Sequence, residues 1–461
     1  MKTDKILKYT SIGSAAAVIL MMAAATIVEK LYGTDTAFRT VYHSPVFIAL
    51  WALTAISGVL HMIRRGTIKK PAIFFLHIAF VLILAGALIT MLTGKSGSMY
   101  LRRGETSANW SSNEGFRQKL PFKLTLKDFS IEYYPGTRDP MDYISKVVVS
   151  DTGKEYTISM NNILKYGGYR FYQSSYDDDL NGSVFSVSHD PWGVPVIYTG
   201  YILLLLSLIG FFFQKNSGFH TSLKSRGQGF SKPVRIVLLV LNVLLLGYLT
   251  FVIGRNWYHS GHGPFVGTYS VMMLMAWLVT AAMVLLRKRL PIIQPLGFVL
   301  AGFSILVASL SFSDPEANLA PVLRSPLLSV HVLCMMVSYT LFGLVALTGV
   351  VGLVKRSQDL RSILRDMSLT ILYPAVFMLT IGTFIGAVWA NISWGNYWAW
   401  DPKETWALIT MLVYSAMLHG STVSRFNKPR FFHAYAIVAF LTVLITYFGV
   451  NFLLGGMHSY A

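Results

Sequence analysis

The chain has 461 residues, of which 54% are hydrophobic and 13% charged, and this composition excludes an ordinary soluble domain. Its formal net charge is +18. In a soluble protein that excess would indicate nucleic acid as a partner, but basic residues also collect in the cytoplasmic loops of membrane proteins, so we expect a membrane and no nucleic acid. The single cysteine, Cys334, excludes an internal disulfide and a cysteine-based metal site, and its apolar surroundings predict a packing role.

Stretches long and apolar enough to cross a bilayer recur along the chain. A span needs about 20 mostly apolar residues, and about eleven stretches meet that criterion. The first follows a lysine-rich start without a clear small-residue cleavage site, which predicts a retained helix rather than a signal peptide. We therefore predict an α-helical polytopic membrane protein with about eleven transmembrane helices. The predicted spans are 11–28, 45–63, 72–93, 194–213, 234–254, 267–286, 292–311, 328–354, 370–391, 404–421 and 432–452.

A polar stretch at 94–190 separates the third span from the fourth and predicts a small β-rich domain. Within it "FKLTL" alternates apolar and polar residues, and "ISKVVVSDTGKEYTISM" predicts two strands around an Asp–Thr–Gly turn. Residues 214–233 are rich in Gly, Ser and Lys and predict a cytoplasmic linker. The chain is thus divided into a first part at 1–213 and a second part at 234–461.

The distribution of basic residues predicts the orientation. With the N-terminus in the cytoplasm, the loops facing that side hold most of the Lys and Arg found outside 94–190. An odd number of spans then places the C-terminus, the β-rich domain and the tryptophan-rich segment 389–406 on the outer side.

Four of the eleven histidines lie at two predicted depths. His77 and His419 both fall near the cytoplasmic side, whereas His331 and His458 fall at the outer surface. A lone histidine at a span end is usually a satisfied interfacial residue, but an ionisable group inside a span marks a functional site by default. Neutral imidazole is a natural axial ligand of heme iron, so the pattern predicts two bis-histidine heme sites. We expect structural roles for His43, His189, His220, His259, His262 and His433.

The segment "WGNYWAWDPKETW" is dense in aromatic residues, and half of the ten tryptophans fall within 389–406. An aromatic belt would spread over all helix ends, whereas a compact shelf suits the flat face of a porphyrin. Asp401 either caps the tenth helix, with Pro402 and Glu404 in its first turn, or has a direct role at the heme site. The sequence leaves both interpretations open. The predicted platform residues are Trp394, Trp398, Trp400, Asp401 and Trp406.

These stretches resemble a known family. "WGNYWAWDPKETW" is similar to the WWD signature of heme-handling proteins in cytochrome c maturation, and "LHG" with "GVNFLLGGMHSYA" resembles the CcsA (ResC) branch. "GGYRFYQSSYD" resembles a stretch of the CcsB (ResB) partner. The chain therefore resembles a fused CcsBA system II cytochrome c synthase, with an outer domain that looks shorter than in typical members.

The resemblance implies heme export across the bacterial cytoplasmic (inner) membrane and stereospecific covalent attachment to apocytochrome c. His77 and His419 resemble the transmembrane pair that receives heme, and His331 and His458 resemble the external pair at the WWD platform. The substrate implied is heme b, expected in the ferrous form, whose vinyl groups take up the thiols of a Cys-x-x-Cys-His motif. Because Cys334 alone cannot cycle a disulfide, a thioredoxin-like thiol reductant is expected as a further partner.

Three other functions remain open from the residues. One is heme export without attachment, and another is a di-heme b-type electron carrier, although such carriers often place ligands for both hemes on shared helices. A pure assembly scaffold would leave the intramembrane histidines unexplained. On charge alone, Arg255 or Lys403 is a candidate partner for heme propionates.

Overall fold

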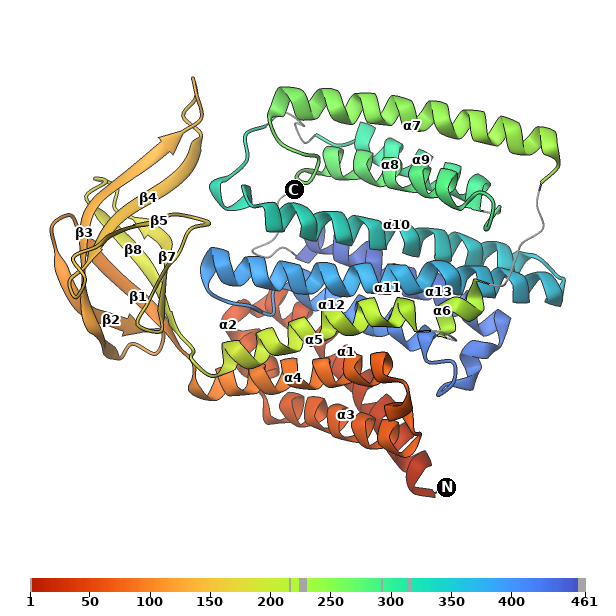
Figure 1. Cartoon of the computed structure of the whole chain (residues 1–461), viewed down its shortest axis with the longest axis horizontal. Coiled ribbons are helices and arrows are strands. Elements are labelled where there is room, and N and C mark those ends of the chain that lie inside the picture. The colour runs from red at the N-terminus through yellow and green to blue at the C-terminus, as the bar shows by residue number, and fades with distance from the viewer. Residues whose placement is uncertain (1, 215–216, 224–229, 292, 313–316, 455–461) are drawn as a thin grey trace.

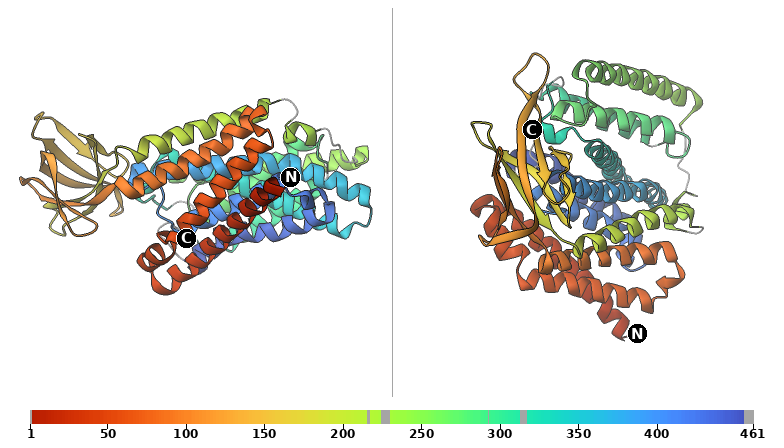
Figure 2. Two further views of the ribbon diagram at one scale, coloured as in Figure 1. Left: turned by 90° about the horizontal axis from the view of Figure 1, so that it is seen from below. Right: turned by 60° about the vertical axis from the view of Figure 1, so that its left-hand side comes forward.

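An antiparallel sheet domain projects from one end of a bundle of helices that run side by side (Figures 1 and 2). The computed structural model describes residues 2–214, 217–223, 230–291, 293–312 and 317–454. We call the end of the bundle next to the sheet the sheet end, and the opposite end the far end.

The first part of the chain contributes four long helices: α1 (Lys2–Tyr32), α3 (Pro45–Arg64), α4 (Pro71–Thr93) and α5 (Gly193–Phe213). Glycines bring α4 and α5 together, because a Cβ at Gly86 would lie 2.6 Å from the Ile197 side chain and one at Gly200 2.7 Å from Ile83. The short elements of this part are α2 (Thr34–Ala37), the π-helix η1 (Phe38–Tyr42) and the 3₁₀ turn η2 (Thr67–Lys69).

The second part forms the larger share of the bundle, with α10 and α11 at its centre and α7 along one border (Figure 1). Its longer elements are α7 (Lys232–Ser260), α8 (Thr268–Leu286), α9 (Ile293–Ser309), α10 (Pro326–Val354), α11 (Gln358–Trp394), α12 (Pro402–Leu418), α13 (Pro429–Leu444) and the π-helix η5 (Ile445–Leu454). The short ones are α6 (Gly218–Ser222), η3 (Pro321–Leu323) and η4 (Ser424–Asn427).

The predicted membrane spans all fall on these helices. Within the described ranges, nine helices are long and apolar enough to cross a membrane. The helices α9 and α12 have 17 residues each, or about 26 Å, slightly less than the hydrocarbon core of about 30 Å. The predicted class, a polytopic α-helical membrane protein with a small β-rich domain, is confirmed. The domain boundary at 214–233 and the side of the membrane on which the sheet lies stay predictions.

The sheet domain lies between α4 and α5 in the chain. Its eight strands follow the order β5-β4-β3-β2-β1-β8-β7-β6 and pair antiparallel. They are β1 (Lys95–Arg102), β2 (Thr106–Ser112), β3 (Arg117–Tyr133), β4 (Pro140–Val149), β5 (Glu155–Ile158), β6 (Leu164–Tyr166), β7 (Tyr169–Tyr176) and β8 (Gly182–His189).

The alternation in the sequence matches the burial in this sheet. Phe122, Leu124 and Leu126 of β3 are buried and the residues between them face outward, as the "FKLTL" pattern predicted. The predicted Asp–Thr–Gly turn connects β4 to β5, where the Gly153 N–H donates to the Val149 carbonyl at 2.9 Å. One apolar core, which includes Phe171, fills the domain.

Candidate functional site

A cavity opens at the sheet end between α8, α10, α11, α12 and η5. The volume of this cavity is about 160 Å³. A π-helix is rare and is frequently found at functional sites, and here η5 contributes to the wall. The polar and aromatic groups of the lining include His331, Trp389, Trp398, Lys403, Glu404 and Asn451.

His331 is held against α11 by two glycines. Its Nδ1–H donates to the Gly382 carbonyl at 2.7 Å, which orients the ring relative to α11. At Gly386 a Cβ would lie 2.5 Å from His331 Nδ1, so glycine is needed for the ring to approach this closely. This arrangement is typical of metal-binding histidines, whose second nitrogen is oriented by a carbonyl or carboxylate.

The same arrangement occurs twice at the far end. His77 Nδ1–H donates to the Ile73 carbonyl at 2.8 Å, and His419 Nδ1–H donates to the Ser415 carbonyl at 2.7 Å. The two rings form an edge-to-face pair, with centroids 5.9 Å apart and planes at 88°. Two imidazole–metal bonds of about 2 Å, added to the ring radii, give a centroid separation of about 6 Å. The predicted far-end pair is therefore close in space, at a separation that two axial ligands could share.

Two other histidines contact backbone carbonyls through Nε2. His433 is fully buried and binds the Arg361 carbonyl through Nε2 at 3.0 Å. His262 engages both nitrogens, with the Gly263 carbonyl at 3.1 Å and the Ala317 carbonyl at 3.0 Å. These arrangements fit the predicted structural roles. His458, the predicted partner of His331, lies outside the described residues.

The predicted tryptophan platform divides into two groups. Trp398 lines the cavity together with Trp389, and Trp394 packs edge-to-face on Trp389 at 5.0 Å. Trp400 instead stacks on Tyr42 at 4.6 Å, and Trp406 Nε1 donates to Thr26 Oγ1 at 3.2 Å. These two tryptophans are packed among α1, η1 and α3 and are not part of the cavity lining.

Asp401 caps α12, which agrees with the helix-cap interpretation of the sequence. Its carboxylate accepts from the Lys403 backbone N–H at 2.9 Å, and its side chain is buried. Glu404 reaches back to accept from the Ala399 N–H at 2.8 Å, so the helix start is held from both sides. Asp401 is not among the residues that line the cavity, whereas Glu404 is.

Of the two cations considered for propionates, Lys403 lines the cavity and Arg255 does not. The Lys403 ammonium donates to Asn451 Oδ1 at 2.8 Å. Sequence reasoning missed Asn451 and the two glycines beside His331. The Gly-x-x-x-Gly spacing at 382–386 was a usable signal, because small residues four apart mark close helix packing in membranes.

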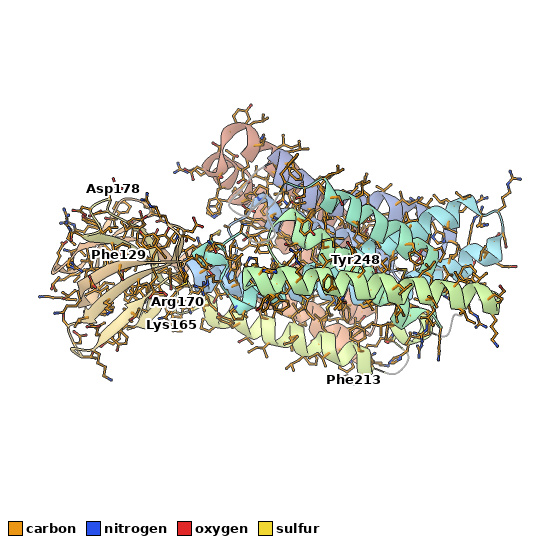
Figure 3. The ribbon with its side chains drawn as sticks, turned by 90° about the horizontal axis from the view of Figure 1, so that it is seen from above. Phe129, Lys165, Arg170, Asp178, Phe213 and Tyr248 are labelled. Carbon is orange, nitrogen blue, oxygen red and sulfur yellow. The ribbon has the colours of Figure 1, made fainter. Side chains whose placement is uncertain are left out.

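The sheet domain adjoins the helix bundle, and Arg170 lies near the boundary between them (Figure 3). Arg170 of β7 donates from Nη1 to Asn391 Oδ1 at 3.1 Å, near the end of α11. Asn161 Nδ2 donates to the Pro321 carbonyl at 3.1 Å, in the segment that leads into α10. Burial raises the pKa of the Tyr397 phenol, which stays neutral beside Arg170. The stretch "GGYRFYQSSYD" therefore supplies one of the contacts between sheet and bundle, and Asn161 supplies another.

The fold and these contacts define a polytopic membrane protein with carbonyl-bound histidines at both ends of its bundle and a sheet domain at one of these ends. Residues 265–458 match the model of the cytochrome C assembly protein family, and residues 61–184 match the ResB-like family. CcsA, a cytochrome c biogenesis protein of Guillardia theta, is 33% identical over 48% of this chain and 87% of its own length. CcsA of Synechococcus sp. (strain CC9605) is 32% identical over 57% of this chain and 94% of its own.

A longer relative also matches. NrfI of Wolinella succinogenes is 35% identical over 53% of this chain, and the match spans only 29% of NrfI. The chain belongs to the cytochrome c assembly (CcsA) family and carries a ResB-like segment in the same polypeptide.

Proposed function

We propose that this protein serves cytochrome c maturation by exporting heme b and attaching it covalently to the Cys-x-x-Cys-His motif of apocytochrome c. Family membership supports the role in maturation. The proposal of heme export and attachment rests on one feature that His77, His419 and His331 share. Each donates Nδ1–H to a backbone carbonyl within 2.8 Å, an arrangement that orients the ring as metal-bound histidines are oriented.

At the far end, His77 and His419 would hold heme iron between them as it enters. The basic loops support a cytoplasmic position for this end, in the bacterial inner membrane. Both rings are anchored to their own helices, so each one is oriented before heme arrives. Little side-chain freedom then remains to be lost on binding.

At the sheet end, His331 and His458 would ligate the heme that is presented to the apocytochrome. Trp389 and Trp398 supply apolar and aromatic wall, and Lys403 supplies a cation for a propionate. Heme brings the reactive vinyl groups, and each thioether forms by addition of a thiol S–H across a vinyl C=C bond without net oxidation. The contribution of the protein is to position the two reactants, which can account for several kcal/mol of the barrier.

The sheet domain would hold the rim of this site, since Arg170 and Asn161 tie it to α11 and to the segment before α10. The substrate thiols have to be reduced to react. Cys334, half-buried in α10, is the only cysteine of the chain, so a separate thioredoxin-like reductant is part of the proposal.

The test is heme attachment to a secreted Cys-x-x-Cys-His reporter in a bacterial host that lacks its own maturation system. We expect heme that stays on the denatured reporter with the wild-type chain and a large loss with His331→Ala. His259→Ala is the matched control, because this exposed histidine lies at the same end of the bundle but outside the cavity lining. Purified protein that carries heme while the reporter stays unmodified would favour export without attachment.

A further inference from the structure

The backbone turns sharply in the middle of the tryptophan-rich segment. Trp400 has a φ of 57°, and Leu180 is the other non-glycine residue with a positive φ in the described part of the chain. Such a conformation is unfavourable for a bulky side chain and persists where the surroundings hold it in place. The turn gives two neighbouring rings different surroundings: Trp398 lines the cavity, whereas Trp400 packs among α1, η1 and α3. The two rings meet edge-to-face, with centroids 5.8 Å apart.

The strained residue is held by a pocket of aromatic rings from the first part of the chain. Trp400 stacks on Tyr42 with planes at 13°, and its edge meets Phe47 with ring centroids 5.2 Å apart. Both partner rings are buried, with 4% and 2% of their surface exposed. The stacking geometry and the burial make this a packed interface core rather than a chance surface contact.

The first turns of α12 extend the same interface. Tyr42 Oη and Thr405 Oγ1 are 3.3 Å apart in a buried hydrogen bond, and the Trp406 indole N–H donates to Thr26 of α1. One turn further along, Ile409 is buried in the same apolar cluster. Aromatic stacking, two hydrogen bonds and an aliphatic contact thus line up along the surface of α12 that faces α1.

We propose that Trp400 and Trp406 are docking residues, which bind the helices of the first part (α1, η1 and α3) to the cytochrome-c-assembly part. The partner surface is an aromatic pocket with two hydroxyl groups, formed by Thr26, Tyr42 and Phe47. The tryptophan-rich segment therefore has two tasks. Its Trp398 side forms the ligand cavity, and its Trp400 side holds the two parts of the chain together. This assignment concerns assembly and does not depend on the proposed heme attachment.

The docking assignment is tested on the full folded chain by cutting it between its two parts. A protease site is inserted at 224–229, the detergent-purified protein is cleaved, and the N-terminal fragment that stays bound to a tagged C-terminal fragment is quantified after dilution. We expect Trp400→Ala and Trp406→Ala to lower the retained fraction several-fold. Trp192→Ala is the matched control, because it removes an exposed tryptophan that is not part of this apolar cluster.

A change on the partner surface provides an independent check. Tyr42→Ala should lower retention as Trp400→Ala does, and the double variant should lose little more than either single variant, since both remove one contact. Contacts of α4 and α5 with Phe377 of α11 persist in every variant, so a partial loss is the expected result.

Two milder variants apply if an alanine variant fails to fold before cleavage. Trp400→Phe keeps an aromatic ring and should retain most of the N-terminal fragment, while Thr26→Val removes only the acceptor of the Trp406 bond and should lower retention. Wild-type retention in Trp400→Ala and Tyr42→Ala, or in Thr26→Val where those do not fold, would overturn the assignment. An equal loss in Trp192→Ala would overturn it as well. None of these readouts needs heme, so the assignment can fail while the proposed function stands.

Discussion

Substituting Gly386 by alanine should weaken heme binding at the sheet end by displacing His331. The added Cβ would lie 2.5 Å from His331 Nδ1 and 2.7 Å from Cε1, well inside van der Waals contact. To reach about 3.5 Å the ring has to withdraw from α11 by about 1 Å. Because the Gly382 carbonyl is on that same helix, the withdrawal also lengthens the 2.7 Å bond from Nδ1 beyond hydrogen-bonding range.

The expected decrease in heme affinity follows from the loss of the hydrogen bond between His331 and the Gly382 carbonyl. Removing an outer partner of a metal-bound histidine typically lowers metal affinity about 10- to 100-fold, or roughly 1.4 to 2.7 kcal/mol. Gly302→Ala in α9 is the control, because no atom lies within 4 Å of its added Cβ. Alanine is also the better helix former there, so this variant should bind heme as the wild type does.

The assay is a heme titration of the purified full chain, followed by the absorption spectrum of the reduced protein. A His77→Gly background removes a far-end ligand, so the sheet-end site dominates the signal. We expect a weaker, altered spectrum in Gly386→Ala that added imidazole restores in part. Wild-type affinity and spectrum in that variant would refute the reasoning that the two glycines seat His331 as a ligand.

Three further changes test other contacts. Arg170→Ala removes the bond to Asn391 and should loosen the sheet domain by about 1.5 kcal/mol, seen as faster native-state proteolysis within 94–190; an unchanged rate would contradict this anchoring role. Asp401→Ala should lower the free energy of unfolding by about 1 kcal/mol while Asn in its place retains most of it, since both Asp and Asn cap helices; equal losses in thermal unfolding would argue against a simple cap. Replacing either His77 or His419 by glycine should reduce far-end heme, with rescue by imidazole, and wild-type heme content in both would exclude a ligand role.

Much of the architecture follows from patterns that depend only on neighbouring residues. Apolar runs of span length predicted the helices, and the alternation in β3 predicted its buried face. The cap of α12 was predictable for the same reason, since Asp401, Pro402 and Glu404 are close in sequence and act within one turn. The depth of a residue within its span also predicted that His77 and His419 would meet.

The division of the tryptophans was not predictable in this way. Trp398 and Trp400 are two positions apart, and the side that each one faces depends on a backbone conformation that bulky residues seldom adopt. Their partners are also remote in sequence, since Tyr42 belongs to the first part of the chain. The anchoring of His331 by Gly382 likewise depends on how α10 and α11 pack, which the sequence of neither helix specifies alone.

The far-end histidine pair is composite: His77 belongs to the ResB-like segment and His419 to the cytochrome-c-assembly segment. A pair of this kind forms only when both contributors are present in equal number and correctly associated. One polypeptide guarantees the one-to-one ratio, and a covalent connection raises the effective concentration of each part for the other, to about the millimolar range for short linkers. Two separate chains would instead depend on matched synthesis and on encounters within the plane of the membrane, and any excess of either would carry one histidine without the other.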